Sequence, residues 1–309
     1  MSIQWFPGHM HKARKEIKKI IMEVDLIIEL TDARIPYSSS NPMITALRDN
    51  KPCIKAMTKS DLADPVLTSL WQQYFEQHQQ TKSIALSVDE PAKTRQLIEL
   101  CKLLVPEKGK GHNNINIMIL GIPNVGKSTL INTLAGRTIA KTGNEPAITK
   151  GQQRINLRNG IMLWDTPGML WPKIESPYSG YRLAATGAIK DTAMSYDDVA
   201  AFTVEYLLKH YPEPLQERFQ LSTLPETDTE FLEAAGKKRG CLGSGGHVDF
   251  EKISTIVLNE MRSGKLGPIT LETPEMIAIE TLAVEKAIAE KEAKKEARKN
   301  LNKNRKKSR

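Results

Sequence analysis

The residues with the clearest chemistry are Gly121–Ser128. They read Gly-Ile-Pro-Asn-Val-Gly-Lys-Ser, the spacing of a loop whose backbone N–H groups surround phosphate. The apolar run Ile115–Leu120 predicts a strand before the loop, and Lys127–Leu134 predicts a helix after it. The helix dipole then also points at the phosphate. This strand, loop and helix context disfavours a chance match.

The side chains of this loop divide the expected contacts with a nucleotide. Lys127 is expected to reach the β- and γ-phosphates, and Ser128 is expected to ligate Mg²⁺. Gly121 and Gly126 permit a tight backbone wrap. The predicted nucleotide contacts in this region are Asn124, Val125, Gly126, Lys127, Ser128 and Thr129.

Two later motifs supply groups expected around the γ-phosphate. The motif Asp-Thr-Pro-Gly ends an apolar strand, so Asp165 can hold Mg²⁺ through water and the Gly168 N–H can meet the γ-phosphate. The polar stretch Pro146–Gly151 suits a mobile switch, in which Thr149 is predicted to contact Mg²⁺ and phosphate. Thr142 is the alternative choice for that threonine.

A guanine-reading motif, Thr-Lys-Ser-Asp at positions 58–61, lies before the phosphate loop. Asp61 offers a carboxylate to the two N–H donors on the guanine edge, which adenine lacks. Lys59 can lie along the ring face, and Ser87 is expected to support the base. Thr58 stands where most GTPases carry Asn, and a hydroxyl replaces only part of a carboxamide's hydrogen-bonding capacity. Alone, Lys-x-Asp is more often a surface turn; the strand before it and Ser87 after it favour the nucleotide site.

The order of these motifs is inverted. An ordinary GTPase runs from the phosphate loop through the switch threonine and Asp-x-x-Gly to Lys-x-Asp, whereas here the guanine motif comes first. A domain tolerates such circular permutation when its original ends lie close together at the surface. We therefore predict that both halves still form one site.

The elements that must position these motifs follow a doubly wound α/β pattern with a mostly parallel sheet. The predicted strands are Asp25–Thr31, Cys53–Met57, Ser83–Val88, Ile115–Leu120, Arg154–Arg158 and Ile161–Trp164. Helices are expected at His9–Glu23, at Gln96–Leu104 and at Lys127–Leu134. From Ser195 onward the pattern is helical, with helices at Val199–His210, Glu230–Ala235 and Phe250–Met261 and turns at Pro212, Gly240 and Gly243–Gly246.

These patterns predict three parts. Residues 1–178 are expected to form a circularly permuted GTPase domain, with a guanine-binding half at 10–105 and a phosphate-binding half at 112–175. The lysine and glycine segment Pro106–Gly111 would join the halves. Residues 179–285 are expected to form a small all-helical domain. Residues 286–309 are expected to be a basic tail without fixed structure.

The tail carries the charge of the chain. Residues 286–309 hold eleven Lys or Arg and three Glu, which matches the formal charge of +8 for all 309 residues. A basic end without aromatic residues favours an RNA partner, while a merely solubilising tail is the alternative. No DNA partner is expected.

Composition also predicts the compartment. No apolar run is long enough to cross a bilayer, and the basic stretch Lys12–Lys19 lacks the apolar core of a signal peptide. We expect a cytoplasmic protein with no membrane partner and, by default, a monomer. Cys53, Cys101 and Cys241 are widely spaced and predicted to be reduced structural thiols.

Taken together, five motifs resemble the YlqF-type circularly permuted ribosome-assembly GTPases (YlqF/YawG family). They are Trp5–Met10 (Trp-Phe-Pro-Gly-His-Met), Asp32–Pro36 (Asp-Ala-Arg-Ile-Pro), Thr58–Asp61, Gly121–Ser128 and Asp165–Gly168. The resemblance spans nearly the whole chain and continues through Asn144–Thr149. In the second part, Arg239-Gly240 and Ser263–Gly267 resemble that family's helical RNA-binding module.

The resemblance implies a ribosome-stimulated GTPase that joins a late precursor of the large (50S) ribosomal subunit, binds its rRNA and leaves after hydrolysis. It also implies an activating K⁺ at Asn124. The chain departs from the family pattern at Thr58, at Val88 and at Glu145 and Ala147. These departures bear on nucleotide affinity more than on the fold.

The group that orients the attacking water is missing from its usual place. Ras-like enzymes carry glutamine after Asp-x-x-Gly, but here Met169 follows, and a thioether cannot orient water. We hypothesise that His9 takes this role, since a neutral imidazole can accept a hydrogen bond from water. A histidine that contacts RNA or caps a helix is the alternative.

Two rival functions remain at this stage. A phosphate-loop ATPase or kinase would use Gly121–Ser128 but would leave Lys59, Asp61 and Ser87 without a role. An RNA-binding scaffold with a structural nucleotide site is motivated by Met169 and by the basic tail.

Overall fold

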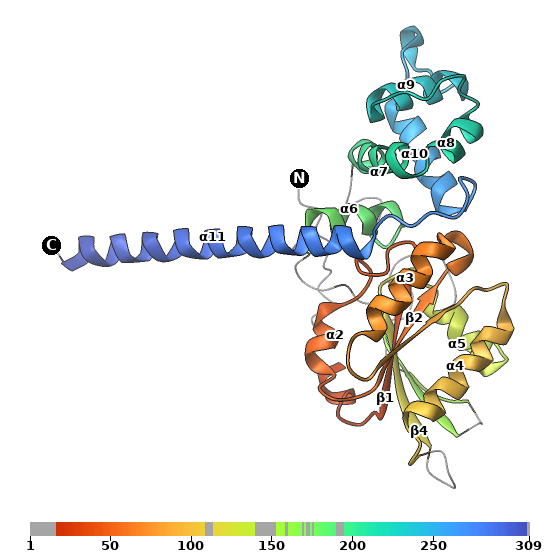
Figure 1. The fold of residues 1–309 in the computed structure, drawn as a ribbon, viewed down its shortest axis with the longest axis vertical. Coiled ribbons are helices and arrows are strands. Elements are labelled where there is room, and N and C mark those ends of the chain that lie inside the picture. The colour runs from red at the N-terminus through yellow and green to blue at the C-terminus, as the bar shows by residue number, and fades with distance from the viewer. Residues whose placement is uncertain are drawn as a thin grey trace. The chain divides into compact units, whose positions relative to one another are not determined.

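A computed structural model describes residues 17–108, 114–139, 153–157, 160–168, 170, 174, 176–189 and 195–307. The chain divides into two compact units, residues 1–272 and residues 273–309. The first unit holds the sheet and the helices α2 to α10 (Figure 1).

A six-stranded sheet forms the centre of the first unit, in the order β3-β2-β1-β4-β6-β5. The strands are β1 (Leu26–Asp32), β2 (Cys53–Thr58), β3 (Thr81–Ala85), β4 (Ile115–Gly121), β5 (Gln153–Asn156) and β6 (Ile161–Asp165). All neighbours pair in parallel except β5 and β6, which are antiparallel. The predicted mostly parallel, doubly wound sheet is confirmed.

Strand β3 ends earlier than its sequence suggested. The pattern predicted a strand at Ser83–Val88, but the strand runs from Thr81 to Ala85. The reason is a turn, because the Asp89 N–H donates to the Ser87 side-chain oxygen (3.1 Å) and draws the chain out of the sheet. Ser87 therefore lies in the loop beyond the strand.

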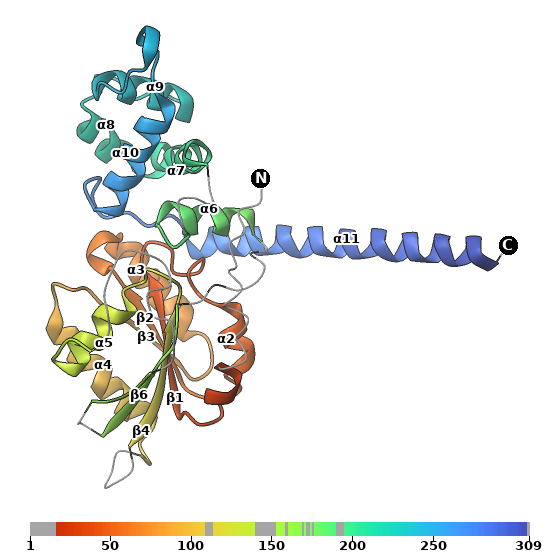
Figure 2. The same ribbon diagram turned by 180° about the vertical axis from the view of Figure 1, so that it is seen from behind.

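Helices cover both faces of the sheet. They are α2 (Pro42–Leu47), α3 (Pro65–Glu76), α4 (Pro91–Leu104) and α5 (Lys127–Ala135), with a short 3₁₀ turn, η1, at Ser60–Leu62. Helices α4 and α5 lie together on one side, and α2 lies on the other (Figures 1 and 2). The central strands β1 and β2 are buried along their whole length, as expected of parallel strands covered on two faces.

Helices α2 and α3 were not among the predicted elements. Each begins with proline in its first turn and is capped by a side chain: Asn41 accepts from the Met43 N–H, and Asp64 accepts from the Val66 and Leu67 N–H groups. A capping residue followed by proline is a known start signal and was available in the sequence. Of the predicted helix His9–Glu23, residues 17–20 are helical and residues 9–16 lie outside the described part.

Beyond the sheet the first unit is helical. The helices are α6 (Pro177–Ala185), α7 (Tyr196–His210), α8 (Pro212–Phe219), α9 (Asp228–Lys238) and α10 (Phe250–Arg262), with η3 at Ser244–Gly246. Helix α10 packs against α7 and α9. The break expected near Pro212 is present, because α7 ends at His210 and α8 begins at Pro212, where the missing N–H costs nothing.

The predicted boundary between residues 178 and 179 stays a prediction. Residues 1–272 form one compact unit, so the helical part is not separated from the sheet. Buried Glu272 illustrates the contact, since its carboxylate accepts from the Tyr37 N–H (2.5 Å) and the Ser38 N–H (2.9 Å) after β1.

The second unit is a single helix, α11 (Pro274–Lys307). It runs through most of residues 286–309, where no fixed structure was expected; the Ala, Glu and Lys of this segment have high helix propensity. Neither α11 nor any other helix in the described ranges is long and apolar enough to span a membrane.

The cysteines are free and buried, as predicted. Burial raises the pKa of Cys53 to about 11 and that of Cys101 to about 12. Both therefore stay protonated near neutral pH, which suits packing and not reactivity.

A buried ion pair links the two central strands of the guanine half. Glu29 of β1 and Lys55 of β2 stand opposite each other in the parallel register, with Nζ 2.7 Å from Oε2. The other carboxylate oxygen accepts from the Asn41 N–H (2.6 Å), which fixes the loop before α2. Both side chains are almost fully shielded from water.

Replacing Lys55 with methionine should lower the free energy of unfolding by about 3–5 kcal/mol, because Glu29 would be left buried without a partner. Equilibrium urea unfolding measures this. The exposed pair between Lys82 and Glu76 (3.5 Å) provides a matched control, and Lys82→Met should cost less than about 1 kcal/mol. Equal losses in the two variants would show that the buried pair adds no special stability.

Candidate nucleotide-binding site

The phosphate loop has the predicted strand, loop and helix context. Strand β4 ends at Gly121 and helix α5 begins at Lys127, with Gly126 before it at a φ of 94°. A Cβ on Gly121 would lie 2.9 Å from the Leu30 carbonyl oxygen and 2.9 Å from a methyl group of Val125. Only glycine fits there, because the loop folds back tightly against β1.

The lysine of the loop and the carboxylate of the Asp-Thr-Pro-Gly motif meet at the carboxyl ends of β4 and β6. The Lys127 ammonium contacts the Asp165 carboxylate, and both side chains are buried. Burial raises the pKa of Asp165 above its ordinary value, although the adjacent Lys127 opposes this shift. The backbone of Pro123 closely borders Gly168. The structure thus brings Lys127, Asp165 and Gly168 to one place.

The donors available for Mg²⁺ are oxygens. Ser128 lies in the first turn of α5, half-buried, and Asp165 ends β6. Hydroxyl and carboxylate oxygens are the ligands that Mg²⁺ prefers, with phosphates and waters completing the shell. No group of three or more His, Cys, Asp or Glu in the described residues could hold a metal by itself. The residues present therefore fit a magnesium ion bound together with a nucleotide.

The residues predicted to read guanine gather at the carboxyl ends of β2 and β3. Lys59 adopts a left-handed conformation (φ 58°), and Asp61 is exposed in η1. The Ser60 N–H donates to the Leu86 carbonyl (3.1 Å), which ties this turn to the loop that carries Ser87. Asp61 and Ser87 are therefore held on adjacent loops, as base recognition requires.

Thr58 contacts the other half of the site. Its hydroxyl lies 2.5 Å from the Val125 carbonyl oxygen in the phosphate loop and 3.0 Å from the Thr31 carbonyl oxygen in β1. The sequence analysis considered this residue only as a substitute for asparagine near the base. The structure shows that its hydroxyl links the guanine-reading turn to the phosphate loop across the permuted halves.

Lys59 belongs to a charged cluster with Asp32 and Arg34, which was not predicted as part of the site. The Lys59 ammonium lies 2.9 Å from one oxygen of Asp32, and Arg34 donates to both oxygens at 2.9 and 2.8 Å. Burial would raise the pKa of Asp32, but Arg34 and Lys59 outweigh it and hold that pKa well below the ordinary range. These ion pairs contribute stability above the ordinary carboxyl pKa, and the contribution is lost as the pH falls towards the folded value. A charged Asp-x-Arg directly after a buried strand was the available signal.

Asn124 reaches from the phosphate loop to the helical part. Its amide nitrogen donates to the Gly187 carbonyl (2.8 Å), just beyond α6. Arg262, at the end of α10, donates to the carbonyls of Ala184 and Ala185 (2.9 Å each) in the same turn. The Asn124 amide nitrogen thus stabilises the fold, and the amide oxygen would be the atom that ligates a potassium ion there.

Several predicted residues lie outside the described part of the chain: His9, Thr142, Thr149 and Met169. Arg239, of the Arg239-Gly240 pair that resembles a helical RNA-binding module, lies at the end of α9. Its guanidinium donates to Glu260 (3.1 Å) and stands 5.1 Å over the Phe219 ring, so it joins α8, α9 and α10.

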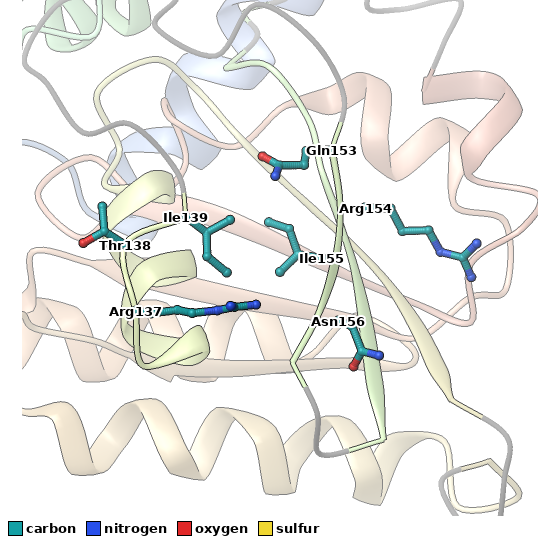
Figure 3. A pocket seen from close by; sticks show the side chains of 7 residues that line it. All are labelled: Arg137, Thr138, Ile139, Gln153, Arg154, Ile155 and Asn156. Carbon is teal, nitrogen blue, oxygen red and sulfur yellow. The ribbon is translucent and has the colours of Figure 1, made fainter.

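A separate cavity of about 530 Å³ lies between the end of α5 and strand β5 (Figure 3). Ile139 and Ile155 face each other across it, whereas Arg154 points away. The remaining lining residues are Arg137, Thr138, Gln153 and Asn156. Among the residues that the structure describes, no predicted nucleotide-binding residue lines this cavity.

Comparisons with known proteins find ribosome biogenesis GTPases similar to this chain. Residues 116–229 match the family described as 50S ribosome-binding GTPase. The chain is 46% identical over 293 residues to ribosome biogenesis GTPase A of Bacillus cereus, covering 93% of this chain and 99% of that protein. It is 31% identical over 275 residues to the protein of the same name from Thermotoga maritima, covering 89% and 96%. The solved structure of GNP-bound YlqF from T. maritima has a TM-score of 0.61 and 27% identity, over 86% of this chain and 99% of that one.

Replacing Thr58 with valine should lower the free energy of unfolding by about 1–3 kcal/mol and weaken GDP binding, because the Val125 carbonyl loses its donor. Urea unfolding and a GDP titration measure the two effects. Thr58→Ser keeps the hydroxyl and should stay close to the wild type. A valine variant that binds GDP as tightly as the serine variant would show that the link does not hold the phosphate loop.

Proposed function

The chain belongs to the ribosome biogenesis GTPase A family and is a guanine-nucleotide-binding GTP hydrolase with a role in ribosome biogenesis. From this premise we propose that it hydrolyses GTP to GDP and phosphate while it assists late assembly of the large (50S) ribosomal subunit. Its partner is the precursor particle, which it contacts through rRNA. The match to a family described as 50S ribosome-binding and the basic residues of 286–309 support this partner.

One observation carries the nucleotide chemistry. Although the motifs are inverted along the chain, the guanine-reading turn and the phosphate loop lie at the same edge of the sheet, joined by the Thr58 hydroxyl and the Val125 carbonyl. Ligands of open α/β sheets bind at the carboxyl ends of the strands. This edge is where base and phosphates of a single nucleotide would be held.

Each residue then has a role in binding. The backbone of Gly121–Ser128 surrounds the phosphates, and Lys127 turns from Asp165 to the β- and γ-phosphates. Ser128, Asp165 and Thr149 hold Mg²⁺, which supplies Lewis-acid stabilisation of the phosphate charge when bound. The Gly168 N–H meets the γ-phosphate. Val125, Gly126 and Thr129 complete the phosphate contacts with Asn124.

The base is read on the other side of Thr58. Asp61 accepts from the two N–H donors of guanine, Lys59 lies along the ring, and Ser87 supports it. Asp32 and Arg34 hold the Lys59 side chain in place. His9 positions the attacking water, and K⁺ at Asn124 adds positive charge beside the phosphates. The chain acts in the cytoplasm as a monomer.

Hydrolysis of GTP should rise when large ribosomal subunits are added to the purified protein in K⁺ buffer. The reason is that contact with the particle is expected to bring the proposed water-positioning group, His9, into place. Phosphate release measures this, with ATP as the control nucleotide. Replacing His9 with alanine should abolish the stimulated rate and preserve GTP binding, and exchange of K⁺ for Na⁺ should slow hydrolysis. Turnover that subunits leave unchanged would contradict the proposed partner.

Asp61→Asn should switch the preference from guanine to xanthine nucleotides, since one carboxylate acceptor becomes a donor that suits the xanthine carbonyl. We expect GTP affinity to fall at least about 100-fold, equivalent to about 2.7 kcal/mol. Competition binding with GTP, XTP and ATP measures this. Asp89→Asn, on the exposed loop after Ser87, is the control and should bind like the wild type. Unchanged GTP binding by the Asp61 variant would remove Asp61 from the base site.

A further inference from the structure

The segment that follows α10, residues 263–272, returns from the helical part to the guanine-reading turn. The Ile269 N–H donates to the Leu62 carbonyl (2.9 Å), directly after Asp61. The Thr270 hydroxyl accepts from the Asp64 N–H (3.1 Å). The C-terminal side of the turn that carries Asp61 is therefore bonded to this segment at two points.

Packing brings the same segment against the turn at a second point. A Cβ on Gly264 would lie only 2.7 Å from a methyl carbon of Leu62, and Gly264 has a φ of 75°. A larger residue would displace the Leu62 methyl group, and the positive φ by itself favours glycine. The Ser263–Gly267 motif, which resembled part of an RNA-binding module, thus packs on the guanine-reading turn.

The segment also holds the charged cluster behind Lys59. The Leu271 N–H donates to the Arg34 carbonyl (2.8 Å), and the Thr270 hydroxyl lies 3.3 Å from the Ala33 carbonyl. The Arg34 guanidinium donates to the Arg262 carbonyl (3.3 Å) at the end of α10. Lys59 pairs with Asp32, the partner of Arg34, so its position depends on the same contacts.

Tyr211, the residue between α7 and α8, also contacts these groups. Its hydroxyl lies 3.1 Å from the Asp64 carboxylate and accepts from the Thr270 N–H (3.2 Å). Burial raises the pKa of Tyr211 to about 12, so the hydroxyl keeps its proton for the carboxylate at neutral pH. Thr270 is fully buried among these groups.

We propose that residues 263–272 form a clamp that positions Lys59 and Asp61, with Thr270 as a positioning residue for guanine recognition. The proposal rests on the proposed base-reading role of Lys59 and Asp61. The segment bonds the turn at Leu62 and Asp64 and also bonds Arg34, contacts that anchoring α10 alone would not require. The helical part is therefore a component of the guanine site.

The clamp couples guanine binding to the helices. It acts on the base, which GDP and GTP share, so it sets the affinity for both and leaves the chemical step alone. A partner that binds α7 to α10 and shifts the clamp changes guanine affinity, and guanine changes the affinity for that partner by the same factor.

The test is Thr270→Val in the full-length chain, which keeps the shape and removes the acceptor of the Asp64 N–H. The dissociation constant for GDP and the KM for GTP should both rise about tenfold, with kcat within about twofold of the wild type. Thr270→Ser keeps the hydroxyl and should restore both values. This split between KM and kcat would not follow from a loss of folded protein, which lowers kcat alone.

Thr203→Val is the matched control. Thr203 is equally buried, and its hydroxyl donates to the Val199 carbonyl (2.7 Å) inside α7, away from the clamp. It should bind GDP like the wild type at a similar loss of stability. GDP binding weakened no more by Thr270→Val than by Thr203→Val would overturn the clamp.

A measurement on the wild type covers the case in which Thr270→Val does not fold. Hydrogen exchange at the Ile269 and Asp64 amides should slow on addition of GDP, while exchange at the last turn of α9 should not. Unchanged exchange at both amides would also overturn the clamp. Wild-type binding of GDP in preference to ADP tests the proposed function separately; if that preference is absent, the base-reading role fails first and the clamp fails with it.

Discussion

The parallel pairing of β1 with β4 is the constraint on which the site depends. Strand β1 belongs to the half proposed to read guanine and β4 to the half proposed to bind phosphate, and Leu30 stands opposite Gly121 in their register. This register places the ends of both strands at one edge of the sheet. Circular permutation leaves it intact, because hydrogen bonds between strands do not depend on the order in which the chain visits them. Beyond the last hydrogen bond between the strands, the Thr58 hydroxyl adds a further link by contacting the Val125 carbonyl oxygen.

Charge is concentrated at this edge and is paired there. Asp32, with Arg34 and Lys59, and Asp165, with Lys127, are carboxylates buried where β1 and β6 end. Unpaired charges would be too costly at such depth. Both sets include a lysine expected to contact the nucleotide, so the fold holds these side chains in place with carboxylates from neighbouring strands. For Lys59, which keeps its carboxylate partner in the proposed complex, such positioning reduces the entropy that binding would otherwise cost.

The helical part contacts both halves of the site through different groups. On the phosphate side, the Asn124 amide binds the turn after α6, and Arg262 binds the same turn. On the guanine side, residues 263–272 bind the turn that carries Asp61. Arg262 belongs to both connections, because its carbonyl accepts from Arg34. The end of α10 is therefore where base recognition, the phosphate loop and the helices meet.

The sequence by itself determined the local features: the phosphate loop with its strand and helix, the order of the motifs, the mostly parallel sheet and the helical nature of the second half. These follow from short-range spacing and hydrophobic period, which a linear pattern records. It also contained the capping residues of α2 and α3, although these two helices were not predicted. Only the tertiary structure decided that Thr58 contacts Val125, that Lys59 pairs with Asp32, and that Gly264 of the Ser263–Gly267 motif packs on Leu62. Each of these joins residues far apart in the chain, and their meeting is set by strand register and helix packing, which no local pattern encodes.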